Sequence, residues 1–272
     1  MIPRHRSGPL ETRHIELPGF SLRRYRVYRP PDISDGRPRP ILVLFDGQNV
    51  FDDEGSFSGG WHADLAIERL ARTRLRPILV GLDHGGEQRI NELSPFPNRF
   101  GNGRADAFLR GIAHQLMPAL RREFLIIEGP VGVLLGGSSM GGLASLYGHL
   151  RFPESFGGAL SMSPSLGVGG QALFDFIQET HRPSISRIYL DTGAREGGAR
   201  LEELGRILRA RHYDADHLLV RVDKRGQHNE RSWRRRLPAA LRFFYRADTD
   251  RQRPVAFQYP ARDSLPTGSP GR

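Results

Sequence analysis

The apolar positions along this chain fall into short continuous runs that alternate with longer amphipathic stretches. Continuous apolar runs at 41–45, 77–82 and 131–135 have the length expected of strands that are covered on both faces of a sheet. Three further strands are predicted at 156–162, 187–191 and 217–222. Helical patterns are found at 64–72, 105–124, 143–150, 172–177, 201–211 and 233–245. Because strands and helices alternate, the sequence predicts an α/β fold with a mostly parallel, doubly wound sheet.

The N-terminal part of the chain follows a different pattern. Residues 11–17 and 23–28 alternate between apolar and polar side chains, and Pro18-Gly19 separates the two stretches. This alternation predicts a pair of antiparallel strands. Residues 83–104 are polar and contain glycine and proline, so we expect a long loop there.

The chain length and the composition of its ends predict a single domain. A chain of 272 residues can bury a substantial core. Residues 1–10 are polar, and residues 248–272 carry several Pro, Arg, Ser and Gly residues, so we expect disorder at both ends and one domain over 11–247. The sequence has no stretch of membrane-spanning length, and no apolar segment of a secretory signal follows Met1. We therefore expect a soluble, cytoplasmic protein.

Charge and cysteine content limit the kinds of partner. The formal net charge is +10, yet Lys224 is the single lysine and the arginines are scattered apart from a cluster at 231–236. A nucleic-acid surface would more often interleave aromatic residues or carry a binding motif, so we expect no specific nucleic-acid partner and no membrane partner. The basic charge favours weak attraction of anionic ligands. The chain contains no cysteine, which excludes disulfides and thiolate metal sites.

The stretch Gly137-Ser138-Ser139-Met140-Gly141 matches the pattern G-x-S-x-G. A predicted strand leads into it and a predicted helix leads out, which is the context of a nucleophile elbow. In such an elbow a strained turn lifts a serine hydroxyl above the edge of the sheet, and the flanking glycines let the turn close without Cβ clashes. The sequence therefore predicts Ser139 as a nucleophile that becomes acylated.

A nucleophilic serine needs a base, and the base needs an acidic partner. In this arrangement the chain order is serine, acid, histidine, and the groups lie in loops after the carboxyl ends of strands. Glu196 lies in the loop after the strand at 187–191, and we favour it as the acid. Asp191 is the competing candidate, because it falls at the end of that strand.

His228 follows the strand at 217–222 and directly precedes the last predicted helix. This is the position at which the arrangement places its base, so we assign His228 that role. His62 and His84 lie in loops that could face the same site and are weaker alternatives.

An acyl-transfer site also needs hydrogen-bond donors for the oxyanion that develops on the substrate. One donor is expected to be the backbone N–H of Met140, directly after the nucleophile. The second is expected in the loop after the first central strand, and the backbone N–H of Gln48 is our candidate. Gly47 would allow a close backbone approach there.

In combination, these segments resemble the putative esterase family of α/β hydrolases, which includes enterochelin (siderophore) esterases, feruloyl and acetylxylan esterases, esterase D and the antigen 85 mycolyltransferases. The resemblance spans residues 10–246. The segments that carry it are 44–51, 81–83 with 89–95, 137–142, and 226–229 with Trp233. Their ordered combination is more specific than any one motif.

The resemblance implies an α/β-hydrolase fold, a three-layer sandwich of helices around the sheet. It also implies Ser139 as nucleophile, His228 as base and Glu196 as acid, with the N–H groups of Met140 and Gln48 as oxyanion donors. No metal or organic cofactor is implied.

These features predict a serine carboxylesterase that acts on a small-molecule ester. A siderophore esterase is one subtype, since the arginines and the loop at 83–104 could attract an anionic ferric catecholate. An acyltransferase would use the same acyl-enzyme, and a non-catalytic binding protein on the same fold is a third alternative. Relatives often carry an aromatic residue after Ser163-Pro164-Ser165, whereas this chain has Leu166, so we expect a wider pocket wall.

Overall fold

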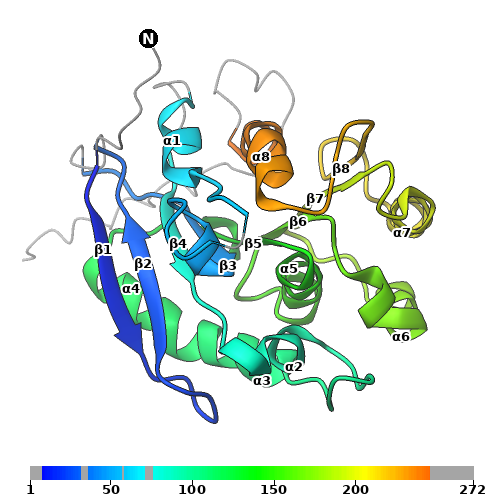
Figure 1. Cartoon of the computed structure of the whole chain (residues 1–272), viewed down its shortest axis with the longest axis horizontal. Helices are drawn as coiled ribbons and strands as arrows, with labels where there is room; N and C mark the ends of the chain where they lie inside the picture. The colour runs from blue at the N-terminus through cyan, green and yellow to red at the C-terminus, as the bar shows by residue number, and fades with distance from the viewer. Residues whose placement is uncertain (1–7, 32–35, 57, 71–75, 246–272) are drawn as a thin grey trace, which may run out of the picture.

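The computed structural model describes residues 8–31, 36–56, 58–70 and 76–245. The ends expected to be disordered are 1–10 and 248–272, and of these 1–7 and the whole of 248–272 lie outside the described residues, as does the end of the helix expected at 64–72. In the described ranges, helices surround a central sheet of eight strands (Figure 1). No helix within them is both long and apolar enough to cross a membrane.

The strands form one sheet in the order β1-β2-β4-β3-β5-β6-β7-β8. Strands β3 to β8 run parallel to one another, whereas β1 pairs antiparallel with β2, and β2 antiparallel with β4. The strands are β1 (Leu10–Ile15), β2 (Arg23–Tyr28), β3 (Ile41–Phe45), β4 (Ile78–Leu82), β5 (Val133–Ser138), β6 (Gly158–Met162), β7 (Arg187–Gly193) and β8 (Leu218–Asp223). This sheet confirms the predicted fold class.

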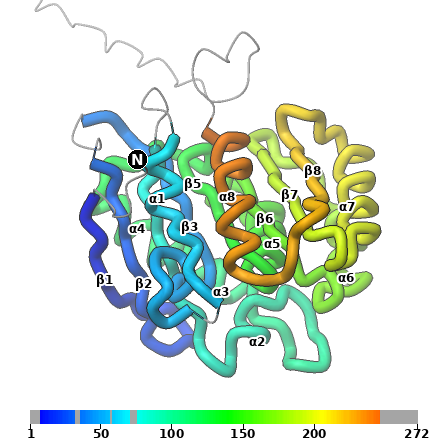
Figure 2. The backbone as a smooth tube through the Cα atoms, turned by 45° about the horizontal axis from the view of Figure 1, so that its top comes forward, coloured from blue at the N-terminus to red at the C-terminus, as the bar shows by residue number. Residues whose placement is uncertain are grey.

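Helices cover both faces of the sheet and complete a three-layer sandwich. One face carries α1 (Ala63–Glu68) and α8 (Glu230–Phe244), which lie together in front of the sheet in Figure 2. The helices of the other face are α2 (Arg89–Leu93), α3 (Ala105–Gly111), α4 (Met117–Glu123), α5 (Met140–Arg151), α6 (Leu166–Glu179) and α7 (Gly198–Ala210). Because side chains alternate along a strand, Leu42 and Leu44 of β3 pack toward α1 and α8, while Val43 and Phe45 pack on the opposite side.

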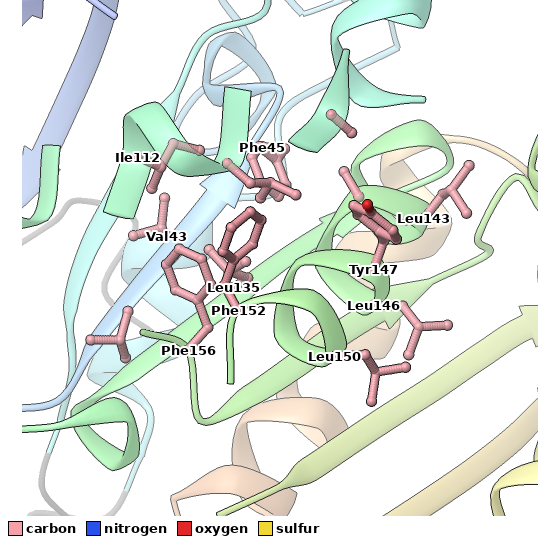
Figure 3. Packing of buried hydrophobic residues seen from close by; sticks show 14 of the residues in the cluster. Val43, Phe45, Ile112, Leu135, Leu143, Leu146, Tyr147, Leu150, Phe152 and Phe156 are labelled. Carbon is pink, nitrogen blue, oxygen red and sulfur yellow. The ribbon is translucent and has the colours of Figure 1, made fainter. Parts of the chain in front are cut away.

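Helix α5 lies in the middle of the molecule and is buried along almost its whole length. Its residues Leu143, Leu146 and Tyr147 belong to the same buried cluster as Phe45 and Leu135 of the sheet (Figure 3). Full burial of an aliphatic or aromatic side chain stabilises a fold by about 1.5–3 kcal/mol. The serine turn at the start of α5 is therefore anchored to the buried core.

Several local predictions differ from the structure, and the first concerns the segment after β4. The segment 83–104 is not a structureless loop, because it contains a 3-10 turn at Gly86–Gln88 and helix α2. Tertiary contacts hold this helix: the buried Glu92 accepts hydrogen bonds from Arg23 and from the Gly85 backbone N–H. A helix held by an ion pair leaves no apolar periodicity that sequence patterns could detect.

The second difference concerns β5, which runs from Val133 to Ser138 rather than over 131–135. Glycines are poor strand formers, so Gly136 and Gly137 hid the end of the strand. In the sheet both pair in register with β6, and a Cβ at position 136 would lie 2.6 Å from Leu44 Cδ2. Similarly, the predicted helix at 105–124 is divided, because a π-helical turn, Ile112–Leu116, separates α3 from α4.

Candidate active site

Ser139 lies on a strained turn between β5 and α5. Its backbone has φ 55 and ψ −118, a combination that L-residues rarely adopt. The turn is tight, since a Cβ at Gly137 would lie 2.7 Å from the backbone of Gly141. The Ser139 N–H donates to the Met162 carbonyl at 2.9 Å, which ties the turn to the end of β6. The serine hydroxyl is thus presented at the carboxyl edge of the sheet.

Three side chains from three separate turns form a hydrogen-bonded chain at this edge. Ser139 Oγ lies 2.9 Å from His228 Nε2, and His228 Nδ1 lies 2.7 Å from Glu196 Oε2. His228 comes from the turn between β8 and α8, and Glu196 from the turn between β7 and α7. With Nδ1–H donated to the carboxylate, Nε2 carries a lone pair that accepts the Ser139 hydroxyl proton. The arrangement can accept a proton from the serine and stabilise the resulting imidazolium.

Glu196 is held in its ionised form by its surroundings. The Gly193 N–H donates to Oε1 at 2.9 Å, and Arg236 Nη2 lies 4.0 Å from the same oxygen. Burial by itself would raise the pKa of Glu196, but hydrogen bonds from His228 and Ser163, with the charges of His228 and Arg236, outweigh it and lower the pKa. A carboxylate that stays ionised can orient and stabilise the histidine.

Asp191, the competing acid in the sequence, occupies a different place. It lies within β7 and is fully buried, and its Oδ2 accepts a hydrogen bond from Tyr189 Oη at 2.9 Å. Arg236 Nη1 lies 3.0 Å from Asp191 Oδ1. Burial raises the pKa of Asp191 to about 6, against the opposing charge of Arg236. The hydrogen bond to His228 is made by Glu196, while Asp191 forms a buried pair with α8.

Sequence reasoning gave no role at the site to the side chains that support the His228 and Glu196 pair, although Trp233 belongs to one of the segments that carry the family resemblance. The Trp233 ring packs edge-on against His228, with centroids 5.0 Å apart. Trp233 Nε1 donates to Ser163 Oγ at 3.1 Å, and Arg236 Nη2 donates to the same oxygen at 2.8 Å. The sequence signal for Arg236 was its position three residues after Trp233, but it was counted only as a member of the basic cluster at 231–236.

Two arginine side chains, Arg89 and Arg26, bind the loop that carries Gln48. Asp46 has φ 57. Arg89 donates two hydrogen bonds to its carboxylate, from Nε at 2.5 Å and from Nη2 at 2.8 Å. Arg26 Nη2 donates to the Gly47 carbonyl at 2.9 Å. A Cβ at Gly47 would lie 2.4 Å from the Gly81 backbone, so only glycine fits this close approach to β4.

The two backbone groups expected to act as oxyanion donors both lie at the start of helical turns. Met140 is the first residue of α5, so its N–H has no acceptor within the helix. Gln48 lies in the 3-10 turn Gly47–Asn49, in which the Asn49 N–H already donates to the Asp46 carbonyl. The Gln48 N–H precedes that bond and is not used by the turn.

A buried carboxylate joins the Gln48 loop to the His228 loop. Glu230 is 7% exposed and accepts a hydrogen bond from Asn49 Nδ2 at 3.3 Å. The Ser58 hydroxyl donates to the other carboxylate oxygen. Because Glu230 is two residues after His228, these contacts connect the His228 turn to the loop that carries Gln48.

Two cavities border Ser165, whose Oγ lies 3.1 Å from Ser139 Oγ, and both have Ser165 and Gly167 in their walls. The first, of about 310 Å³, reaches His228 and Arg200. The second, of about 590 Å³, is lined on its outer side by Asn98, Arg99 and Phe100. The segment 83–104 therefore contributes to the walls, and each cavity contains one arginine.

The weaker histidine candidates do not contact Ser139. His62 Nε2 lies 2.9 Å from Asp53 Oδ1, and His84 Nδ1 accepts the Gly86 N–H at 2.9 Å. Among the described residues, no group of three or more His, Cys, Asp or Glu side chains is arranged as a metal site.

Comparison with known proteins agrees with this architecture. A family model described as "Putative esterase" matches residues 21–244. The chain is 24% identical over 242 residues to protein YbbA of Bacillus subtilis, covering 82% of this chain and 92% of YbbA. It is 32% identical over 163 residues to the iron(III) salmochelin esterase of Escherichia coli O6:H1, covering 59% of this chain but 36% of that protein.

A solved structure of similar fold is the enterobactin esterase of Shigella flexneri in the presence of enterobactin. Its TM-score is 0.70 at 20% sequence identity, over 88% of this chain and 60% of that chain. At this identity the likeness concerns the fold. The chain therefore spans little more than a third of the salmochelin esterase and under two thirds of the enterobactin esterase.

Proposed function

The chain belongs to the putative esterase family, and we propose that it hydrolyses carboxylic esters through an acyl-enzyme formed on Ser139. The observation that carries this proposal is the hydrogen-bonded chain from Ser139 Oγ through His228 to Glu196. A serine on a strained turn, a histidine within 2.9 Å of it and an ionised carboxylate behind that histidine are the parts that serine hydrolysis requires.

In the first half of the reaction, His228 Nε2 takes the proton of Ser139 while Oγ attacks the ester carbonyl carbon. The tetrahedral intermediate collapses when the bond to the alcohol oxygen breaks, and the imidazolium gives its proton to the departing alcohol. Glu196 stabilises the imidazolium throughout. The remaining acyl-enzyme is then hydrolysed by water, with His228 as base again.

The oxyanion of each tetrahedral intermediate would be bound by the N–H groups of Met140 and Gln48. Loss of one such donor costs about 3 kcal/mol of transition-state stabilisation in serine hydrolases. The contacts of Arg89, Arg26 and Glu230 with the Gln48 loop support this role, because a preorganised donor does not have to move during the reaction.

For the substrate, we propose a small ester with anionic character, of which siderophore-like esters are one subtype. Arg200 and Arg99 each line one of the two cavities beside Ser139, which favours negative charge on the bound ligand. The named activities of the salmochelin and enterobactin esterases support the same class. Hydrolysis of p-nitrophenyl esters without any hydrolysis of a triscatecholate ester would exclude the siderophore subtype.

The test of the reaction class is intact-mass measurement after incubation with a fluorophosphonate. We expect a single adduct on the wild-type protein and none on Ser139→Ala, together with loss of ester hydrolysis in that variant. Failure of the folded wild-type protein to react would overturn the proposal, as would unchanged ester hydrolysis in Ser139→Ala.

A further inference from the structure

Ser165 lies at the reacting centre, although it has no place in the chain of Ser139, His228 and Glu196. Its Oγ is 3.1 Å from Ser139 Oγ, and its backbone N–H donates to the Ser139 carbonyl at 3.0 Å. It is the N-cap residue of α6, yet its side chain makes no capping hydrogen bond. The hydroxyl of Ser165 is therefore held beside the nucleophile instead of serving the helix.

The direction of the bond between the two serines follows from the histidine. Since His228 Nδ1–H donates to Glu196, Nε2 accepts the only hydroxyl proton of Ser139. Ser139 Oγ then offers Ser165 only lone pairs. In the resting site Ser165 is consequently the donor, and its own lone pairs are not used by that bond.

Ser165 also borders open space near Ser139. It lines both cavities, and His228 lines the first of them. Once the alcohol product has left, a water molecule can occupy the place beside His228 Nε2. Such a water needs a second polar partner to be held in one orientation, because one hydrogen bond leaves it free to rotate.

We propose that Ser165 is a positioning residue for deacylation, whose hydroxyl holds the attacking water beside His228. This inference rests on the proposed function. His228 Nε2 takes one proton of the water, and the water oxygen forms a bond to the acyl carbonyl carbon. The bond between that carbon and Ser139 Oγ then breaks, the imidazolium returns its proton to Oγ, and the carboxylic acid leaves.

The experiment compares Ser165→Ala with the wild-type protein in both halves of the reaction. Fluorophosphonate labelling measures the reactivity of Ser139 without any deacylation, and we expect its rate to stay within about threefold of wild type. With a p-nitrophenyl ester we expect deacylation to slow by about tenfold, as for loss of one hydrogen bond to the reacting water. The acyl-enzyme should then accumulate, with a burst of nitrophenol and an adduct visible by intact mass.

The values of kcat and KM distinguish a role in deacylation from a merely structural role of Ser165. When deacylation alone slows, kcat and KM fall together and kcat/KM is unchanged. Methanol has a single O–H, which His228 accepts, so it cannot donate a second hydrogen bond to Ser165 as water can. Its attack should therefore slow less than that of water in Ser165→Ala, and the ratio of methyl ester to free acid should rise. Ser165→Thr keeps the hydroxyl and should show a rate of deacylation close to that of wild type. Ser155→Ala, which removes a serine hydroxyl before the start of β6, is the matched control and should leave both rates unchanged.

Equal slowing of labelling and of deacylation in Ser165→Ala would overturn the inference, since Ser165 would then act on Ser139 itself. Unchanged deacylation would overturn it as well. Both results leave the proposed function intact, provided that the wild-type protein is labelled on Ser139. Absence of labelling in the wild type would instead be a failure of the proposed function.

Discussion

Arg89 donates two hydrogen bonds to the carboxylate of Asp46, one of 2.5 Å from Nε and one of 2.8 Å from Nη2. Asp46 has φ 57 and directly precedes the turn that carries Gln48. Left-handed backbone costs a residue other than glycine on the order of 1 kcal/mol, and the bidentate pair offsets this cost. The ion pair therefore holds the loop in the conformation that the proposed oxyanion site needs.

Loss of the two hydrogen bonds from Arg89 to Asp46 should lower kcat more than it raises KM. In Arg89→Lys the positive charge remains, but a single ammonium group cannot bind both carboxylate oxygens in the same geometry. We expect kcat for a p-nitrophenyl ester to fall by about tenfold, while KM changes little. Arg110→Lys, on the exposed surface of α3, is the matched control. A wild-type kcat in Arg89→Lys would contradict the role of the pair.

Replacing Glu196 by glutamine should lower kcat much more than replacing Asp191 by asparagine. Glu196→Gln removes the charge behind His228 and favours the wrong tautomer, so we expect kcat to fall by about 10³–10⁴-fold. Asp191→Asn leaves that contact in place, so it should keep most of the activity although it weakens the buried pair with Arg236. Steady-state kinetics on both purified variants test this difference. The reverse ranking would assign the acid role to Asp191.

The lowered pKa of Glu196 predicts a dependence of stability on pH. Its ionised form is favoured in the folded protein, so its stabilising contribution is present above its usual pKa of 4.5 and is lost as pH falls through the lowered pKa. Urea unfolding of wild type and Glu196→Gln should give a larger stability difference at about pH 5.5 than at about pH 3. A difference that does not change with pH would contradict this environment for Glu196.

A methyl group at position 47 should displace the Gln48 loop. A Cβ there would meet the Gly81 backbone at 2.4 Å, and backbone atoms cannot move aside as a flexible side chain can. We expect Gly47→Ala to lower the free energy of unfolding by about 1–3 kcal/mol and to reduce kcat. Gly198→Ala is the control, since its Cβ would meet only Val222 methyl groups at 3.7 and 3.8 Å. Equal thermal stability of the two variants would contradict the prediction.

Much of the fold could be predicted because its signals are local. The apolar runs at β3 and β4 and the alternation at β1 and β2 reflect burial on two faces or on one, and each can be seen within a few residues. Helix α2 could not be predicted, because a buried ion pair between Arg23 and Glu92 supports it from 69 positions away in the chain. The glycine-rich end of β5 was missed for a related reason, since close packing rather than propensity makes it a strand.

For the candidate site, the sequence by itself determined the serine turn and the order of the groups that follow it. Glycine spacing and chain order are properties of a linear pattern, so Ser139, Glu196 and His228 could be named together. Only the tertiary structure decided which carboxylate contacts His228, because Glu196 and Asp191 are five positions apart yet point into different surroundings. It also decided that, among many surface arginines, the partly buried Arg89 and the buried Arg236 lie beside the site. Their charge is evident in the sequence, but their partners are brought to them only when distant strands and helices pack.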